Sequence, residues 1–224
     1  MSALLLVLLA QAGFSAREVT HEGARFQVVT LETSKVAVSL RRDVKRLGDA
    51  KKGALAAMNA GIFEPGLEPT GLLVVDGKAL FPLNTKRGEG NFYMEPNGVF
   101  VVTRDGRAAV MSTEDFAAKK PDALHATQSG PMLVHGGRIN AKFKKGSKNV
   151  NVRNGVGVKG DRVFLVLSAE EVTFHAMASL FHDALGCDEA LYLDGFISEL
   201  AADGLKPARE PSHDFAAFIV ARPR

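Results

Sequence analysis

Short runs of strand-forming residues, separated by tight-turn dipeptides, recur along this chain and limit the folds open to it. Leu72–Val75 and Lys78–Phe81 flank Asp76-Gly77, a dipeptide typical of two-residue β-hairpin turns. The same kind of signal returns at Asn97-Gly98, Asp105-Gly106 and Gly160-Asp161. Strands joined this closely run antiparallel, so the pattern argues against a doubly wound parallel sheet.

Other strand-like runs extend this prediction. Arg25–Leu31 and Lys35–Leu40, joined by the turn-forming residues 32–34, are expected to form an opening hairpin. Further strands are expected at Asn91–Met94, Val99–Thr103, Arg107–Met111, Pro131–Arg138, Val156–Val158, Arg162–Leu167 and Asp214–Ala221.

One clear helix is expected over Ser168–Leu185. Ser168 and Glu171 have the spacing of a capping box, and Gly186 supplies the stop. A second, short helix is expected at Thr113–Lys120. The predicted fold class is therefore α+β, with mixed, mainly antiparallel sheets, this one clear helix and one or two short ones.

The chain opens on an apolar run that is too short to span a bilayer and is followed by small residues. We interpret residues 1–15 as a signal peptide and residues 16–224 as a single domain, exported to the periplasm or secreted. The run has no preceding Lys or Arg, so a misassigned start or an N-terminal core strand is the alternative. No later apolar run approaches the ~18 residues of a membrane span, so no stable membrane span is expected.

Charge is distributed unevenly along the chain. The net charge of +3 is low for a nucleic-acid-binding domain, so no nucleic acid partner is expected. Residues 123–160 carry Lys and Arg but no acid, whereas residues 163–205 carry Asp and Glu but no Lys or Arg. Two solvated faces would explain this division. It also suits a site that holds an anion with one block and performs acid chemistry with the other.

The stretch Ala190–Leu193 delivers a carboxylate, Asp194, directly into Gly195. A continuous apolar run is typical of a buried strand, and an acid at its end, followed by a flexible glycine, lies where a substrate can reach it. Such a pair also opens ordinary tight turns, so this feature alone leaves both interpretations open.

Other glycine-containing motifs lie at similar strand ends: Met58–Phe63 with Pro69–Leu72, then Thr127–Met132, Val152–Gly157, and Gly186–Ala190 leading into Leu193–Gly195. In their order and spacing, they resemble the phosphodiester glycosidase domain family. The resemblance covers about Ala57–Ser198. The chain departs from the commoner family pattern at Phe196 and Ile197, which stand where further glycines are usual, although Ser198 still follows.

The resemblance implies an exported hydrolase that cleaves a glycosyl-phosphodiester linkage in a glycan or cell-envelope polymer, with a glycan or sugar-phosphate as its substrate. It implies three catalytic residues, Asp194, Arg153 and Asn59. It implies substrate-binding roles for Gly61, Ser129, Gly130, Asn154, Gly195 and Ser198.

The residue types suit this chemistry. A carboxylate such as Asp194 can act as nucleophile, base or stabiliser when positive charge develops on a sugar ring. A phosphate ester departs as a stable anion, which favours cationic and N–H donors, and Arg153 offers paired donors. A turn, a loop-bridging arginine and an asparagine cap are the structural alternatives for Asp194, Arg153 and Asn59. The second carboxylate is left unassigned among Glu64, Glu68 and Glu199.

Several other site classes lack support. The six histidines show no pair at metal-ligand spacing, and the single Cys187 excludes a cysteine-based zinc site, so no metal is expected. Gly155-Val156-Gly157 has no following helix, so no nucleotide and no other cofactor is expected. Two other functions remain open, namely a non-catalytic glycan- or anionic-polymer-binding domain on the same fold and a phosphodiesterase.

Overall fold

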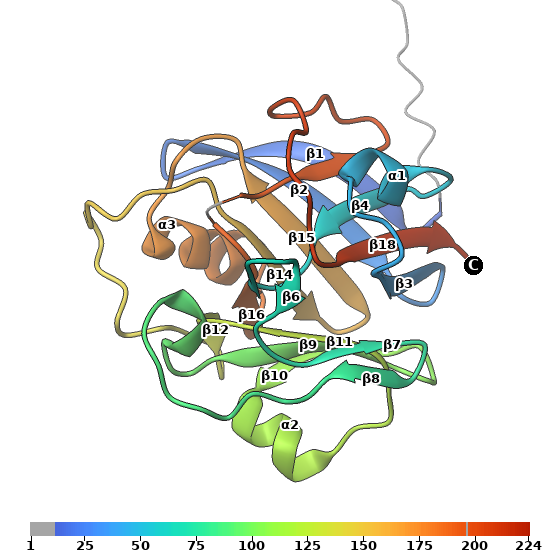
Figure 1. Cartoon of the computed structure of the whole chain (residues 1–224). Helices are drawn as coiled ribbons and strands as arrows, with labels where there is room; N and C mark the ends of the chain where they lie inside the picture. The colour runs from blue at the N-terminus through green and yellow to red at the C-terminus, as the bar shows by residue number, and fades with distance from the viewer. Residues whose placement is uncertain (1–11, 196) are drawn as a thin grey trace, which may run out of the picture.

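Three sheets surround a shared apolar core in the computed structural model, which describes residues 12–195 and 197–224 (Figure 1). The largest sheet has seven strands, in the order β1 (Phe14–His21), β2 (Ala24–Glu32), β15 (Arg162–Ser168), β14 (Asn154–Lys159), β16 (Glu189–Tyr192), β12 (Met132–His135) and β13 (Arg138–Ile139). The second has five, in the order β10 (Ala108–Ser112), β9 (Gly98–Thr103), β11 (Ala123–Ser129), β7 (Leu73–Val75) and β8 (Lys78–Phe81).

A third sheet has four strands, in the order β17 (Leu200–Ala202), β4 (Ala56–Asn59), β18 (Phe218–Pro223) and β3 (Val36–Arg41). A small hairpin pairs β5 (Phe63–Glu64) with β6 (Glu68–Pro69). The strand pairs in the described part of the chain are antiparallel throughout. The α+β fold with mainly antiparallel sheets is confirmed.

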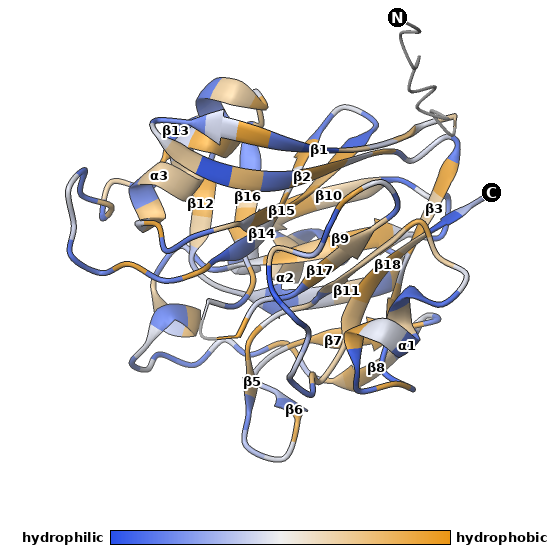
Figure 2. Cartoon of the chain, turned by 90° about the horizontal axis from the view of Figure 1, so that it is seen from above, coloured by the Kyte–Doolittle hydropathy of each residue, from blue (hydrophilic) through white to orange (hydrophobic). Residues whose placement is uncertain are grey.

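Alternation along the strands explains the layering. Phe100 of β9 faces the shared core, whereas its neighbours Val99 and Val101 face the opposite side of the sheet. Each outer face is covered by a short helix: α3 (Phe174–Ser179) on the seven-stranded sheet, α2 (Thr113–Lys119) on the five-stranded sheet, and α1 (Leu47–Lys51) on the four-stranded sheet. Figure 2 shows the apolar residues gathered on the central strands and the polar ones in the loops.

Glycines in β14 make room for the segment after α3. A Cβ at Gly157 would lie 2.6 Å from the ring of Phe181, and one at Gly155 would lie 3.1 Å from it. Phe181 belongs to the π-helical turn η2 (Leu180–Ala184), which continues directly from α3. The two glycines therefore serve helix-on-sheet packing.

The expected long helix begins later than predicted. Ser168 is the last residue of β15, and its hydroxyl accepts a hydrogen bond from the backbone N–H of Arg153 at 2.9 Å. The helix cap is Thr173, whose hydroxyl accepts from Ala176 N at 3.1 Å. The prediction of a capping box at Ser168 and Glu171 is wrong because the strand runs through Ser168.

The expected opening hairpin is also wrong. β2 lies between β1 and β15, whereas β3 pairs with β18 in another sheet. Because β2 is largely buried, its backbone N–H and C=O groups need a strand partner on both sides. The turn after β2 leads the chain into another sheet. Asn91–Met94, expected as a strand, instead contains the 3-10 turn η1 (Asn91–Tyr93).

The hairpins β7–β8, β9–β10 and β14–β15 and the helix α2 are confirmed. The expected strands at Pro131–Arg138 and Asp214–Ala221 correspond to β12 with β13 and to β18. Across the residues that the structure describes, no helix has the length and apolarity needed to cross a membrane.

Candidate active site

Four segments that are distant in sequence meet around the loop Asp194–Glu199. Asn59 is the last residue of β4, Ser129 the last of β11, and Asn154 the first of β14. Asp194 is the second residue after β16. Hydrogen bonds join all four segments, so the structure brings together the residues chosen from the motifs.

Asn59 and Asn154 form a clamp on the two ends of this loop. Asn154 Nδ2 donates to Asn59 Oδ1 at 3.0 Å and to the Asn59 carbonyl at 2.9 Å. Asn154 Oδ1 accepts from the backbone N–H of Asp194 at 2.7 Å, and Asn59 Oδ1 accepts from that of Glu199 at 2.9 Å. We call Asn59 and Asn154 the asparagine clamp.

The clamp leaves little of either amide for a substrate. Both side chains are at most 1% exposed, and both N–H bonds of the Asn154 amide are directed at Asn59. Asn59 Nδ2 approaches the Ile197 carbonyl at 3.4 Å, inside the same loop. In this geometry the two asparagines position Asp194.

Ser198 and Ser129 fix the backbone on either side of Asp194. The Ser198 hydroxyl donates to the Asp194 carbonyl and approaches Asn154 Oδ1 at 3.3 Å. The Ser129 hydroxyl donates to the Leu193 carbonyl at 2.7 Å. Both hydroxyls therefore hold the main chain that carries Asp194.

Gly61 and Gly130 permit close approach between chain segments. A Cβ at Gly61 would lie 2.5 Å from the Gln128 carbonyl, and one at Gly130 would overlap the Phe92 carbonyl. These contacts pack residues 60–62 and η1 against the end of β11. Packing alone thus requires both glycines.

Tyr192, which the sequence did not single out, lies at the centre of the site. A Cβ at Gly195 would overlap the Tyr192 hydroxyl, so only glycine fits after Asp194. The hydroxyl accepts from Arg153 Nη1 at 3.5 Å, and the Asn91 side chain lies near enough to lower its pKa slightly. Burial raises the pKa of Tyr192, the charge of Arg153 partly opposes this, and the charge of Asp194 adds to it. The phenol is therefore neutral and can donate a hydrogen bond.

Arg153 lies behind Tyr192 and is fully buried. Its Nε donates to the Val172 carbonyl at 2.9 Å, its Nη2 donates to Asn149 Oδ1 at 2.8 Å, and its guanidinium carbon is 3.7 Å from the centre of the Phe174 ring. It forms no ion pair with any carboxylate in the described part of the chain, and burial lowers its pKa. Direct phosphate binding by Arg153 stays a prediction, because the buried guanidinium is linked to the Asp194 loop through its hydrogen bond to the Tyr192 hydroxyl.

The carboxylates at the two ends of the loop are both largely buried. Asp194 is 8% exposed and Glu199 is 2% exposed. Glu199 Oε1 accepts from the backbone N–H groups of Ser212 and His213, at 2.8 and 3.1 Å, and lies 3.1 Å from His213 Nδ1. Its Oε2 is buried without a hydrogen-bond partner among residues 12–195 and 197–224. Glu199 thereby anchors the segment before β18 to the site.

Glu64 and Glu68, the other candidates for the second carboxylate, are not part of the Asp194 loop. Glu64 accepts from the Thr70 hydroxyl at 3.1 Å, beside Glu68 on the exposed β5–β6 hairpin. Phe196 lies outside the described residues, so the departure from the motif at this position is not described. Within the described ranges, no group of three or more His, Cys, Asp or Glu side chains could hold a metal ion.

A family model described as phosphodiester glycosidase matches residues 52–218. The chain belongs to the phosphodiester glycosidase family. The match contains the asparagine clamp, Ser129, Tyr192 and the Asp194 loop, and it confirms the resemblance drawn from the motifs.

Two known proteins are similar to this member of the phosphodiester glycosidase family. The Escherichia coli (strain K12) protein YigE is 37% identical over 150 residues, which make up 66% of this chain and 58% of YigE. The chain thus spans less than two thirds of that relative. The auto-inhibited catalytic domain of zebrafish N-acetylglucosamine-1-phosphodiester alpha-N-acetylglucosaminidase (NAGPA) matches with a TM-score of 0.65 and 16% identity, over 94% of this chain and 82% of that one. At this identity the likeness concerns the fold alone.

Proposed function

We propose that this protein is an exported hydrolase that cleaves a sugar from a phosphodiester in a glycan or cell-envelope polymer. The observation that carries the proposal is the convergence of four family-matched segments on the loop that begins with Asp194. Family membership supports glycosidase chemistry, and the linkage, polymer and export are inferences from this chain.

In the proposed reaction, the bond between the anomeric carbon and the bridging phosphate oxygen breaks. Water supplies a hydroxyl to the sugar and a proton to the medium, and the phosphate leaves as a monoester. Asp194 meets the positive charge that develops on the ring. Because the asparagine clamp fixes its backbone, the carboxylate is positioned before the substrate arrives.

The leaving phosphate needs donors or positive charge more than it needs a proton. Tyr192 is the neutral donor beside Asp194, and the buried cation Arg153 polarises it. Asn149, which binds Arg153, ends an exposed loop that carries Lys142, Lys144 and Lys148. This loop supplies positive potential on the approach of an anionic substrate.

Asp194→Asn tests the proposal, because it keeps the shape of the side chain and removes its charge. Turnover of a glycosyl phosphodiester should fall at least ~100-fold, or about 2.7 kcal/mol in the barrier. Asp188→Asn is the matched control, since Asp188 is an exposed acid just before β16 and should tolerate the change. Both variants should melt within a few degrees of the parent.

Three outcomes separate the alternatives. Parental turnover in a folded Asp194→Asn variant contradicts the assigned role. Affinity for a sugar phosphodiester without any turnover in the parent indicates a binding domain. Hydrolysis in isotopically labelled water that places the label on phosphate, and not on the sugar, indicates a phosphodiesterase.

Export is a separate part of the proposal. Phe14 and Ser15 form the start of β1, where they pair with Leu31 and Thr30, so processing is expected before Phe14. Intact-mass measurement of protein from the native host tests this, and full-length protein confined to the cytosol would contradict it.

A further inference from the structure

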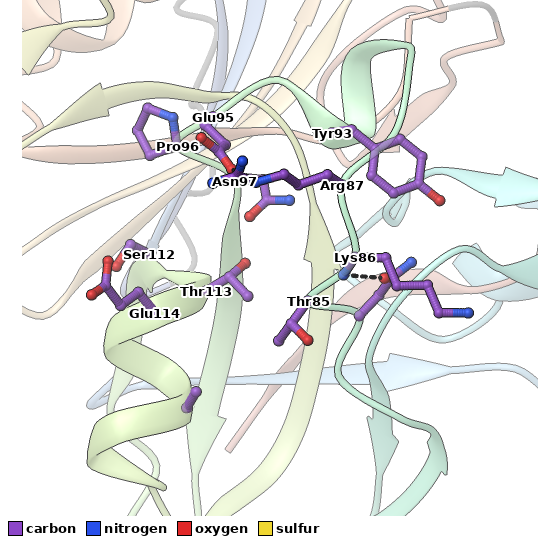
Figure 3. Close-up of a pocket in the computed structure, with 12 residues that line it drawn as sticks. Thr85, Lys86, Arg87, Tyr93, Glu95, Pro96, Asn97, Ser112, Thr113 and Glu114 are labelled. Atoms are coloured by element: carbon purple, nitrogen blue, oxygen red, sulfur yellow. Dashed lines mark hydrogen bonds and ion pairs between the residues drawn. The ribbon is translucent and has the colours of Figure 1, made fainter.

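Two adjoining pockets lie beside η1, at Tyr93. Their volumes are about 720 Å³ and about 520 Å³, and both are lined by Asn84, Thr85, Lys86 and Tyr93. The two pockets adjoin at these four residues, and we call them together the Tyr93 groove. In Figure 3, Tyr93 and Lys86 stand on one side of it, and Ser112, Thr113 and Glu114 at the start of α2 stand on the other.

The floor of the groove is held by a buried amide. Gln128 is 2% exposed, and its Oε1 accepts from the backbone N–H groups of Leu72 and Asn84, at 3.0 and 2.9 Å. Its Nε2 donates to the Asn84 carbonyl at 2.7 Å and to Thr113 Oγ1 at 3.1 Å. All four hydrogen-bonding positions of this amide are used, so the two walls keep their separation when the groove is empty.

The three residues of η1 connect the groove to the candidate active site. The Asn91 side chain lies near the Tyr192 hydroxyl and lowers its pKa slightly, and Phe92 is buried against Gly71 and Gly130. Tyr93 faces the groove, with its ring 5.0 Å from that of Phe92 in an edge-to-face arrangement. The turn η1 thus contacts both the candidate active site and the groove, so a substrate chain that crosses η1 would meet the Tyr93 ring.

The charges and polar groups that line the groove indicate which kind of ligand it can bind. In the larger pocket, the cations Lys86 and Arg87 are balanced by Glu95 and Glu114. The smaller pocket adds two further acids, Glu64 and Glu68, and no further cation. An anionic polymer is thus disfavoured. Hydroxyls and amides from Thr85, Thr113 and Asn97 beside an aromatic ring suit an uncharged, hydroxyl-rich ligand.

We infer that the Tyr93 groove binds a neutral oligosaccharide, the part of the substrate that continues beyond the phosphate. That the sugar belongs to the substrate rests on the proposed function; the binding itself does not. An uncharged sugar chain packs one face on Tyr93 and hydrogen-bonds to the hydroxyl and carboxylate groups opposite.

Calorimetric titration tests the inference with a panel of neutral tetrasaccharides of glucose, mannose, galactose and N-acetylglucosamine, and with polyphosphate as the anionic probe. At least one tetrasaccharide should bind the parent. Tyr93→Ala should weaken it at least ~10-fold, whereas the matched control Tyr93→Phe, which keeps the ring, should stay within ~2-fold. Thermal melting checks that both variants fold.

The inference is overturned if the whole panel fails to bind, if polyphosphate alone occupies the groove, or if a folded Tyr93→Ala variant binds the sugar like the parent. Failure of the proposed function gives a different result. In that case the tetrasaccharide binds in a manner that depends on Tyr93, but no glycosyl phosphodiester is turned over. If both hold, Tyr93→Ala raises KM for a phosphodiester with a long sugar chain and leaves KM for a short one unchanged.

Discussion

The asparagine clamp makes a quantitative prediction about coupling between two buried amides. Asn154→Ala removes the acceptor that the Asp194 N–H uses at 2.7 Å and both donors to Asn59. A buried N–H left without an acceptor costs about 1–3 kcal/mol, and a lost neutral hydrogen bond about 1 kcal/mol more. We expect Asn154→Ala to lower the free energy of unfolding by about 2–4 kcal/mol.

Asn59→Ala should cost a similar amount, because it leaves the Glu199 N–H without its acceptor. The double variant should cost less than the sum, since the bond between Asn59 and Asn154 is lost only once. A coupling of about 1 kcal/mol is expected from urea unfolding with unchanged m-values. Additivity to within about 0.5 kcal/mol would refute the clamp.

Asn140 provides the matched control for activity. It is a largely buried asparagine that binds the Met132 carbonyl at 3.1 Å and the Lys142 N–H at 3.0 Å, away from the Asp194 loop. Asn140→Ala should therefore cost stability but leave the turnover of folded protein unchanged. Asn154→Ala should reduce both. Equal turnover in the two variants would mean that the clamp supports the fold without positioning Asp194.

Three further predictions concern single side chains. Gly195→Ala should lower the melting temperature and turnover because its Cβ would overlap the Tyr192 hydroxyl, and Tyr192→Phe in the same chain should recover part of the melting temperature. Burial raises the pKa of Cys187 to about 12, so iodoacetamide at pH 8 should alkylate the native thiol at least ~100-fold more slowly than the unfolded one. Burial also lowers the pKa of His125, so the unfolded chain takes up the proton first as pH falls. Stability should therefore fall below about pH 6.5, and His125→Gln should flatten the change in urea midpoint between pH 7.5 and 5.5; an unchanged slope would exclude His125 as its cause.

Local signals in the sequence predicted the local structure. The hairpins β7–β8 and β14–β15 follow from turn residues that lie between the paired strands. The partner of β3 is β18, most of the chain away, and nothing within either strand identifies the other. Capping-box spacing at Ser168 was equally local, but the ladder between β15 and β2, which pairs Ser168 with Phe26, extends the strand through it.

The motifs predicted which residues meet, but the roles of those residues required the structure. Asn59 and Asn154 were expected to contact substrate, which stays a prediction; in the structure their amides bind each other and the Asp194 loop. Tyr192 was missed because a tyrosine in an apolar run has the pattern of a core residue. In the structure, the Tyr192 hydroxyl occupies the space that a Cβ at Gly195 would need.

The strand order of the four-stranded sheet has a consequence for biosynthesis. β18 lies between β3 and β4, so two strands from the first third of the chain are joined only by one of the last to be synthesised. Until β17 and β18 emerge from the ribosome, β4, with Asn59 at its end, has no strand partner on either side. Both strands therefore keep unpaired edges through most of translation, which makes the nascent chain prone to aggregation until its last strand is made.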